Sequence, residues 1–182
     1  MLALVGMPGS GKSTVGRQLA RRLNFTFIDS DQEIEQRLGC SIREYFEREG
    51  EDRFRKIESE VLKELTQSKS GVLSTGGGTV LRPENRAWLH QHTQVFYLRT
   101  SPEEVFKRLR HDRNRPLLQV GAPLLKLQEL FHLRDSLYRE AAHHVVELNK
   151  PTIGAMVRKI IDILAAAETR SIPHDSSIQH KT

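Results

Sequence analysis

The stretch LALVGMPGSGKST, residues 2–14, decides the fold. Its first four residues are apolar and predict a buried β-strand, and the residues that follow match the pattern G-x-x-x-x-G-K-[S/T]. Glycines allow backbone N–H groups to turn toward phosphate oxygens, and the positive end of the next helix dipole faces the same anion. In such a loop Lys12 reaches the β- and γ-phosphates and Ser13 coordinates Mg²⁺. The stretch therefore predicts a site for Mg·ATP; the alternative is a glycine turn without a ligand.

Outward from this loop, short apolar runs alternate with longer segments of helical period. The predicted strands are Leu2–Val5, Phe25–Ile28, Gly71–Ser74, Gln94–Leu98 and His144–Leu148. This alternation is typical of parallel strands joined by crossover helices, so we expect an α/β fold with a five-stranded parallel sheet. A capping-box pattern at Ser41 and Glu44 and a proline after Ser101 predict helix starts. Gly39 and Gly50 predict helix ends.

The bulk properties favour one ordinary globular domain. The chain has 182 residues, of which 37% are hydrophobic and 28% charged, and no apolar run reaches the ~20 residues that span a bilayer. One cysteine, Cys40, excludes an internal disulfide, so we expect a cytoplasmic protein with no membrane partner. The net charge of +5 permits nucleic-acid binding, but we expect none because no such motif is present and aromatic residues are 6%.

Two carboxylates follow the second predicted strand, in the sequence FIDSD. Ligands of open α/β sheets bind beyond the carboxyl ends of the strands, where Asp29 and Asp31 would lie. If the strand geometry continues, both side chains point to the same side. One could then hold the Mg²⁺ shell while the other orients or deprotonates a substrate hydroxyl. The alternative is a structural role, with Ser30 or Asp31 capping the next helix.

Three glycines and several arginines complete the candidate site. Gly76, Gly77 and Gly78 after a buried strand imply a close backbone approach, and their amides could form an anion-binding concavity; a sharp turn is the alternative. Arg55, Arg115 and Arg134 could bind a carboxylate or phosphate bidentately, although each alone could be a surface charge.

Taken together, these motifs resemble the shikimate kinases. The resemblance covers about residues 2–165 and rests on GMPGSGKS, DSDQEIE, GExxFR, the triple glycine and RPLL, in the family's order. It implies a three-layer P-loop kinase fold with strand order 2-3-1-4-5, within a domain of residues 1–167. It also implies a substrate-binding insertion at about 32–67 and a lid at about 111–124. We expect residues 168–182 to form a disordered tail.

The resemblance also implies the roles of individual residues. Lys12, Asp31 and Arg115 would be catalytic, with Asp31 at the reacting 3-hydroxyl and Arg115 closing over the phosphate. Nucleotide contacts would come from Gly9, Ser10, Gly11, Lys12, Ser13, Thr14, Arg108 and Arg115, with Arg108 near adenine. Substrate contacts would come from Asp31, Phe46, Phe54, Arg55, Glu58, Gly76, Gly77, Gly78 and Arg134. Ser13 and Asp29 would hold the metal. The turn NKPT, residues 149–152, departs from the longer polar stretch often found there, which leaves the adenine contacts open.

The expected activity is ATP- and Mg²⁺-dependent phosphorylation of shikimate by a monomer. Another kinase of the same core, acting on gluconate or a nucleoside monophosphate, is one alternative. A catalytically idle ATP-binding module or a nucleic-acid-binding regulator is the other.

Overall fold

The computed structural model describes residues 1–67, 70–110 and 121–170 and contains a five-stranded parallel sheet. The strands are β1 (Leu2–Val5), β2 (Phe27–Asp29), β3 (Val72–Ser74), β4 (Gln94–Arg99) and β5 (His144–Glu147), in the order β2-β3-β1-β4-β5. The expected sheet and strand order are therefore confirmed. Residue Leu4 of β1 pairs with Ser74, the last residue of β3, and with Phe96 of β4, which continues beyond the end of β1 to Arg99.

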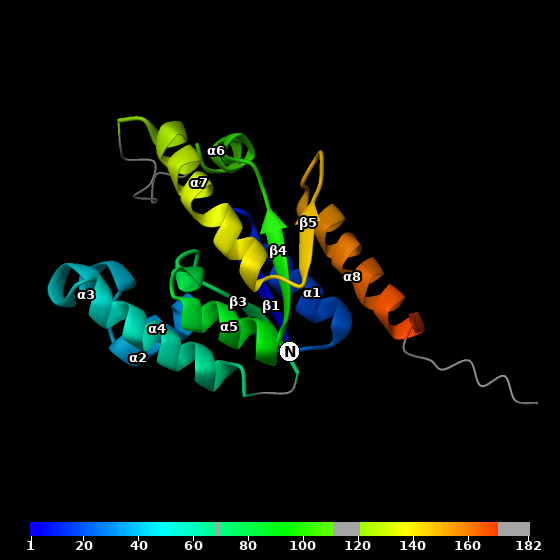
Figure 1. Cartoon of the computed structure of the whole chain (residues 1–182), viewed down its shortest axis with the longest axis horizontal. Coiled ribbons are helices and arrows are strands. Elements are labelled where there is room, and N and C mark those ends of the chain that lie inside the picture. Colours follow the sequence, from blue (N-terminus) through cyan, green and yellow to red (C-terminus); the bar gives the residue numbers. More distant parts are fainter. Residues whose placement is uncertain (68–69, 111–120, 171–182) are drawn as a thin grey trace, which may run out of the picture.

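Helices cover both faces of this sheet (Figure 1). They are α1 (Lys12–Leu23), α2 (Ser30–Leu38), α3 (Ile42–Glu49), α4 (Glu51–Leu65), the 3₁₀ turn η1 (Thr79–Leu81), α5 (Pro83–His92), α6 (Pro102–Leu109), α7 (Pro123–Ala141) and α8 (Ile153–Arg170). On one face, Leu4 and Phe96 pack against Leu19 of α1 and Ile160 of α8. On the other, a second core joins the sheet to α4, α5 and α7. The sheet is thus buried between two helical layers.

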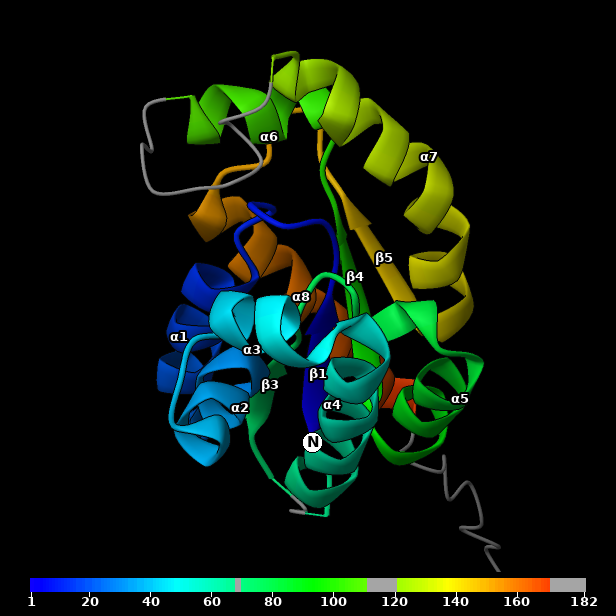
Figure 2. The same ribbon diagram turned by 90° about the vertical axis from the view of Figure 1, so that its left-hand side faces the viewer.

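The segment between β2 and β3 is helical. Figure 2 shows α2, α3 and α4 grouped together, with α6 and the start of α7 lying above them in that view. The three helices have a small core of their own, in which Ile34, Phe54 and Val61 are buried. The capping box at Ser41 and Glu44 is present. Gly39 ends α2 in the left-handed conformation, with φ of 68°, as expected.

Several predicted boundaries were wrong. β2 begins at Phe27 because α1 ends in a left-handed Asn24, and the Phe25 N–H still bonds to the Ala20 carbonyl at 2.8 Å. Pro123, which we expected in the lid, is the first residue of α7, a position that proline favours. The rest of the predicted lid, 111–120, lies outside the described residues. β5 ends at Glu147.

The end of α8 also differs from the expectation. The helix continues to Arg170, three residues into the predicted tail. The alanines at 165–167 favour helix, and after the helix begins the next proline is Pro173. Residues 171–182 lie outside the described part of the chain. Among the described residues, no helix combines the length and apolar character that a membrane span requires.

Candidate active site

A cavity of about 400 Å³ opens beyond the carboxyl ends of β1, β2 and β3. Most of its lining comes from three parts of the sequence that carry the predicted motifs: the loop before α1, the β2–α2 junction, and the glycine segment after β3. Residues of α6 and α8 complete it. The lining residues are Pro8, Gly9, Gly11, Lys12, Ser13, Thr14, Asp29, Asp31, Ser74, Thr75, Gly77, Arg108, Leu109 and Ile153. The fold therefore brings the predicted phosphate loop and both aspartates to the same space.

The loop before α1 has the backbone that its glycines permit. Gly9 and Gly11 have φ of 79° and 96°, which other residues rarely adopt. Gly9 also packs against α6, where an added Cβ would lie 2.5 Å from Leu109. The Lys12 ammonium is nearly buried and donates to the carbonyls of Gly6 at 2.8 Å and Met7 at 2.9 Å. Its charge thus lies beside the first residues of the phosphate loop.

Three oxygens meet at the metal position that the sequence predicts. The Ser13 hydroxyl donates to Asp29 Oδ2 at 2.7 Å and lies 3.3 Å from the Ser74 hydroxyl. The described residues contain no cluster of three His, Cys, Asp or Glu side chains that could hold a metal alone. A serine hydroxyl and one carboxylate nevertheless fit Mg²⁺, which is usually held by few protein oxygens together with waters and phosphates. The donor set therefore suits a nucleotide-bound magnesium ion.

Asp29, rather than Ser30 or Asp31, caps α2. Its Oδ1 accepts from the backbone N–H of Asp31 at 3.1 Å and of Gln32 at 3.4 Å. The strand ends at Asp29 and the helix starts at Ser30, so the argument from strand alternation was wrong for Asp31. The two carboxylates reach the same cavity because Asp29 caps the helix and Asp31 lies in its first turn.

The carboxyl group of Asp31 is largely buried, and its surroundings disfavour its charge. Burial, followed by the nearby charges of Asp29 and Glu58, raises its pKa to about 6, although Lys12 acts in the opposite direction. Its Oδ1 lies so close to the glycine segment that a Cβ at Gly76 would be 2.6 Å away. A carboxylate with a pKa near neutrality, facing a cavity, is suited to accept a proton.

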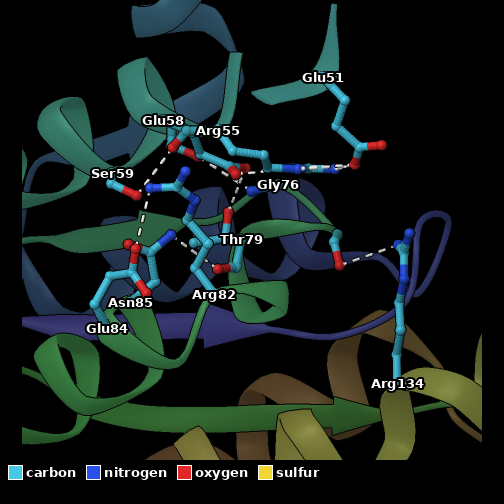
Figure 3. A network of polar contacts seen from close by, with 12 residues as sticks. Glu51, Arg55, Glu58, Ser59, Gly76, Thr79, Arg82, Glu84, Asn85 and Arg134 are labelled. Carbon is cyan, nitrogen blue, oxygen red and sulfur yellow. Dashed lines mark hydrogen bonds and ion pairs between the residues drawn. The ribbon is translucent and has the colours of Figure 1, made fainter. Parts of the chain in front are cut away.

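Arg55 lies on α4 in a fixed position. Its guanidinium pairs with Glu58 at 2.8 Å and with Glu51 at 3.1 Å, and it lies over the rings of Phe46 and Phe54. Burial alone would lower the pKa of Arg55, but the two ion pairs raise it above its ordinary value. Glu58 is 2% exposed and also accepts from the Thr79 hydroxyl at 2.9 Å, so the partner of Arg55 is itself held in place (Figure 3).

The glycine segment is packed by side chains of this protein. An added Cβ would meet Asp31 at Gly76, Pro8 at Gly77 and the Arg55 guanidinium at Gly78, at 2.6, 2.8 and 2.5 Å. The expected close approach is thus confirmed. The Gly76 amide donates to the Ser30 hydroxyl at 3.1 Å, so this N–H does not contribute to the anion-binding concavity that we expected.

Arg134 reaches the same segment from α7. Its Nη1 donates to the Gly77 carbonyl at 3.3 Å, and Figure 3 shows the side chain approaching from a different element than Arg55. The two guanidinium groups thus come to the glycine segment from α4 and α7.

Arg108 lies at the other end of the cavity. It donates to the Ser10 carbonyl at 2.9 Å and to the Pro151 carbonyl, and burial lowers its pKa while Glu104 acts against this. It thereby links the phosphate loop to the turn at residues 149–152, beside a second hollow of about 450 Å³. Arg115 lies outside the described residues.

The motifs gave no role to several residues of this site. Ser74 and Thr75 line the cavity, Glu51 holds Arg55, and Tyr138 binds the Gly77 carbonyl at 2.7 Å. The position of Ser74 and Thr75 at the end of a predicted strand was a usable signal. The roles of Glu51 and Tyr138 depend on distances between helices, which spacing along the sequence does not give.

The fold and the site together define a P-loop phosphotransferase. The family model for shikimate kinase matches residues 8–165. Shikimate kinase from Paracidovorax citrulli strain AAC00-1 is 55% identical over 170 residues, which cover 92% of this chain and 93% of that protein. The enzyme from Ralstonia nicotianae strain GMI1000 is 50% identical, with 90% and 86% covered. The chain belongs to the shikimate kinase family.

A solved structure supports this assignment. Shikimate kinase from Acinetobacter baumannii, in complex with shikimate, has a TM-score of 0.85 and 46% identity, with coverage of 92% of this chain and 93% of that one. The resemblance inferred from the motifs is thereby confirmed, and kinases for gluconate or nucleoside monophosphates are not favoured.

Proposed function

We propose that this protein transfers the γ-phosphate of ATP to the 3-hydroxyl of shikimate, giving shikimate 3-phosphate and ADP. One observation carries the proposal: the phosphate loop with Lys12 and Ser13 opens into the same cavity as Asp31. Direct transfer requires the donor phosphate and the acceptor hydroxyl to meet within bonding distance, with their charges stabilised. Another kinase substrate or an idle ATP-binding module is less well supported, because the family is that of the shikimate kinases and the site keeps Lys12, Ser13 and both aspartates.

The substrate carboxylate would bind between Arg55 and Arg134. Each guanidinium offers paired N–H donors that match a carboxylate. Arg55 is held by Glu58 and Glu51, so little side-chain entropy is lost when it binds. Phe46 and Phe54 would form the apolar wall of this subsite, beside Arg55. In this proposal the insertion at 32–67 supplies substrate specificity.

With the substrate held in this way, its 3-hydroxyl would face the γ-phosphate, and phosphoryl transfer could follow. Asp31 orients the 3-hydroxyl and accepts its proton as the oxygen forms its bond to the γ-phosphorus, while the bond to ADP breaks. Lys12 stabilises the charge on the phosphate oxygens, which is the main requirement of phosphoryl transfer. Gly77 and Gly78 would lie alongside substrate and phosphate, and Glu58 would keep Arg55 in place. Arg115 and the rest of the predicted lid, 111–120, keep the roles that the family resemblance implies.

Magnesium would be held by Ser13 and Asp29, whose oxygens lie 2.7 Å apart. When bound, the ion neutralises charge on the β- and γ-phosphates. That the protein is monomeric and cytoplasmic and binds no nucleic acid stays a prediction.

Arg55→Ala is expected to raise KM for shikimate by about tenfold or more while kcat changes less, because a charged hydrogen-bond pair to the carboxylate is lost. The variant also leaves Glu58 buried without its partner, so its melting temperature should fall. The measurement is steady-state kinetics with shikimate varied at saturating ATP.

Arg53→Ala is the matched control. Arg53 lies two residues earlier on α4, with 69% of its side chain exposed, and pairs with Glu49. We expect the KM of Arg53→Ala for shikimate to equal that of the wild type. An unchanged KM in Arg55→Ala would remove this arginine from the carboxylate site.

The activity itself is tested by coupled ADP release from purified protein, with shikimate, gluconate and nucleoside monophosphates as acceptors, with and without Mg²⁺. We expect ADP formation that depends on both shikimate and Mg²⁺. ADP release with another acceptor, or RNA binding at moderate salt without any acceptor-dependent release, would contradict the proposal.

A further inference from the structure

The Gly77 carbonyl accepts two hydrogen bonds from neighbouring turns of α7. Tyr138 donates its hydroxyl at 2.7 Å, and Arg134 donates Nη1 at 3.3 Å, the contact drawn in Figure 3. The first distance is the usual one for an O–H donor, whereas the second is long for an N–H donor. The tyrosine is therefore the main partner of this carbonyl, and the arginine is held loosely.

Tyr138 is fixed in this position. It is fully buried, and its ring packs against the ring of Tyr97 on β4, with centroids 5.0 Å apart. Burial raises the pKa of Tyr138 to about 12, although Arg134 acts against the rise, so the phenol keeps its proton at neutral pH. Gly77 is fixed on its other side by Pro8, which leaves no space for a Cβ. The hydroxyl and the carbonyl thus form a rigid pair.

Tyr138 can hold the Gly77 carbonyl while Arg134 binds substrate. If Arg134 binds the substrate carboxylate, as the proposed function requires, its hydrogen bond to the Gly77 carbonyl must lengthen or break. A partly buried carbonyl that loses its donor costs free energy, and that cost would oppose substrate binding. With Tyr138 in place the carbonyl keeps its stronger bond, so moving the arginine costs little.

We propose that Tyr138 is a positioning residue that holds the Gly77 carbonyl and so frees Arg134 to bind the carboxylate of shikimate. The inference rests on the proposed function and extends it to a residue that does not itself touch substrate. Tyr138 acts on affinity for the acceptor, because Arg134 bonds to the glycine segment at Gly77 and, in the described part of the chain, does not line the cavity at the phosphate loop. Acceptor KM should therefore change more than kcat or the KM for ATP.

The test is Tyr138→Phe, which removes only the hydroxyl and keeps the buried ring. We expect KM for shikimate to rise about tenfold, with kcat and KM for ATP within about threefold of the wild type. Tyr97→Phe is the matched control, because it removes a hydroxyl that donates at 2.8 Å to Asp135, away from Gly77. Both variants should lose similar thermal stability, but only Tyr138→Phe should change KM for shikimate.

A double-mutant cycle with Arg134→Ala separates this role from general support of the site. In the Arg134→Ala background, Tyr138→Phe should change KM for shikimate by less than about twofold, because no arginine remains to be released. An unchanged KM in Tyr138→Phe, an equal change in Tyr97→Phe, or the full tenfold change without Arg134 would overturn the inference. Wild-type protein without shikimate-dependent ADP release would instead overturn the proposed function.

Discussion

Lys12→Met is expected to lower kcat for shikimate-dependent ADP formation by about 100- to 1,000-fold, the usual cost of removing one group that stabilises transition-state charge. The Lys12 ammonium is nearly buried at the mouth of the phosphate loop, where little water would screen it. Methionine keeps the apolar stem in the same space, so the fold should persist. Steady-state kinetics at saturating substrates, with circular dichroism as a check of folding, measure the effect.

Lys63→Met is the matched control for this charge removal. Lys63 is exposed near the end of α4 and lies over the Trp88 ring, far along the helix from Arg55. The kcat of the Lys63→Met enzyme should equal that of the wild type. A Lys12→Met enzyme with more than about a tenth of wild-type kcat would mean that the loop does not act on the transferred phosphate.

Asp31→Asn is expected to lower kcat by about 100- to 10,000-fold, the usual contribution of a general base. In the wild type, kcat/KM should fall as pH drops through about 6, because the carboxyl must be ionised to accept a proton and its pKa is raised to about 6. An aspartate with an ordinary pKa would remain active to about pH 4. Activity that persists in Asp31→Asn would remove the residue from proton transfer.

The same substitution should stabilise the protein. Because the folded-state pKa of Asp31 lies above its ordinary value of 3.8, ionisation of Asp31 opposes folding. That penalty is absent below about pH 4, grows between about pH 4 and 6, and is complete above pH 6. Asparagine cannot ionise, so at pH 8 the free energy of unfolding of Asp31→Asn should exceed that of the wild type by on the order of 3 kcal/mol, and its melting temperature should be higher. Near pH 4 the two proteins should have similar stability. A lower melting temperature for the variant at pH 8 would contradict this.

The sheet and the phosphate loop could be predicted because their signals are local. Apolar runs gave the five strands, and the glycines that allow the loop to turn are adjacent in the sequence. Boundaries were less certain where competing signals overlap: Phe25 looks like a strand residue, yet Asn24 ends α1 in a way that holds Phe25 to the helix.

The site could be predicted only as far as the motifs reach. Asp29 and Asp31 were identified, but the cap on α2 was expected at Ser30 or Asp31, because the sequence does not show that the helix starts directly after the strand. The glycines signalled a close approach without showing that Asp31, Pro8 and Arg55 fill the space. Such contacts join residues that are distant in sequence, so they become visible only in the folded chain.

The central claim is that one cavity holds the phosphate loop and the acceptor side by side. Its most direct test is a crystal structure of the protein with Mg·ADP and shikimate. We expect the β-phosphate in the loop at Lys12 and the 3-hydroxyl within hydrogen-bond distance of Asp31, facing each other across continuous space. Shikimate in a separate cavity, with protein atoms between it and the nucleotide, would contradict the account.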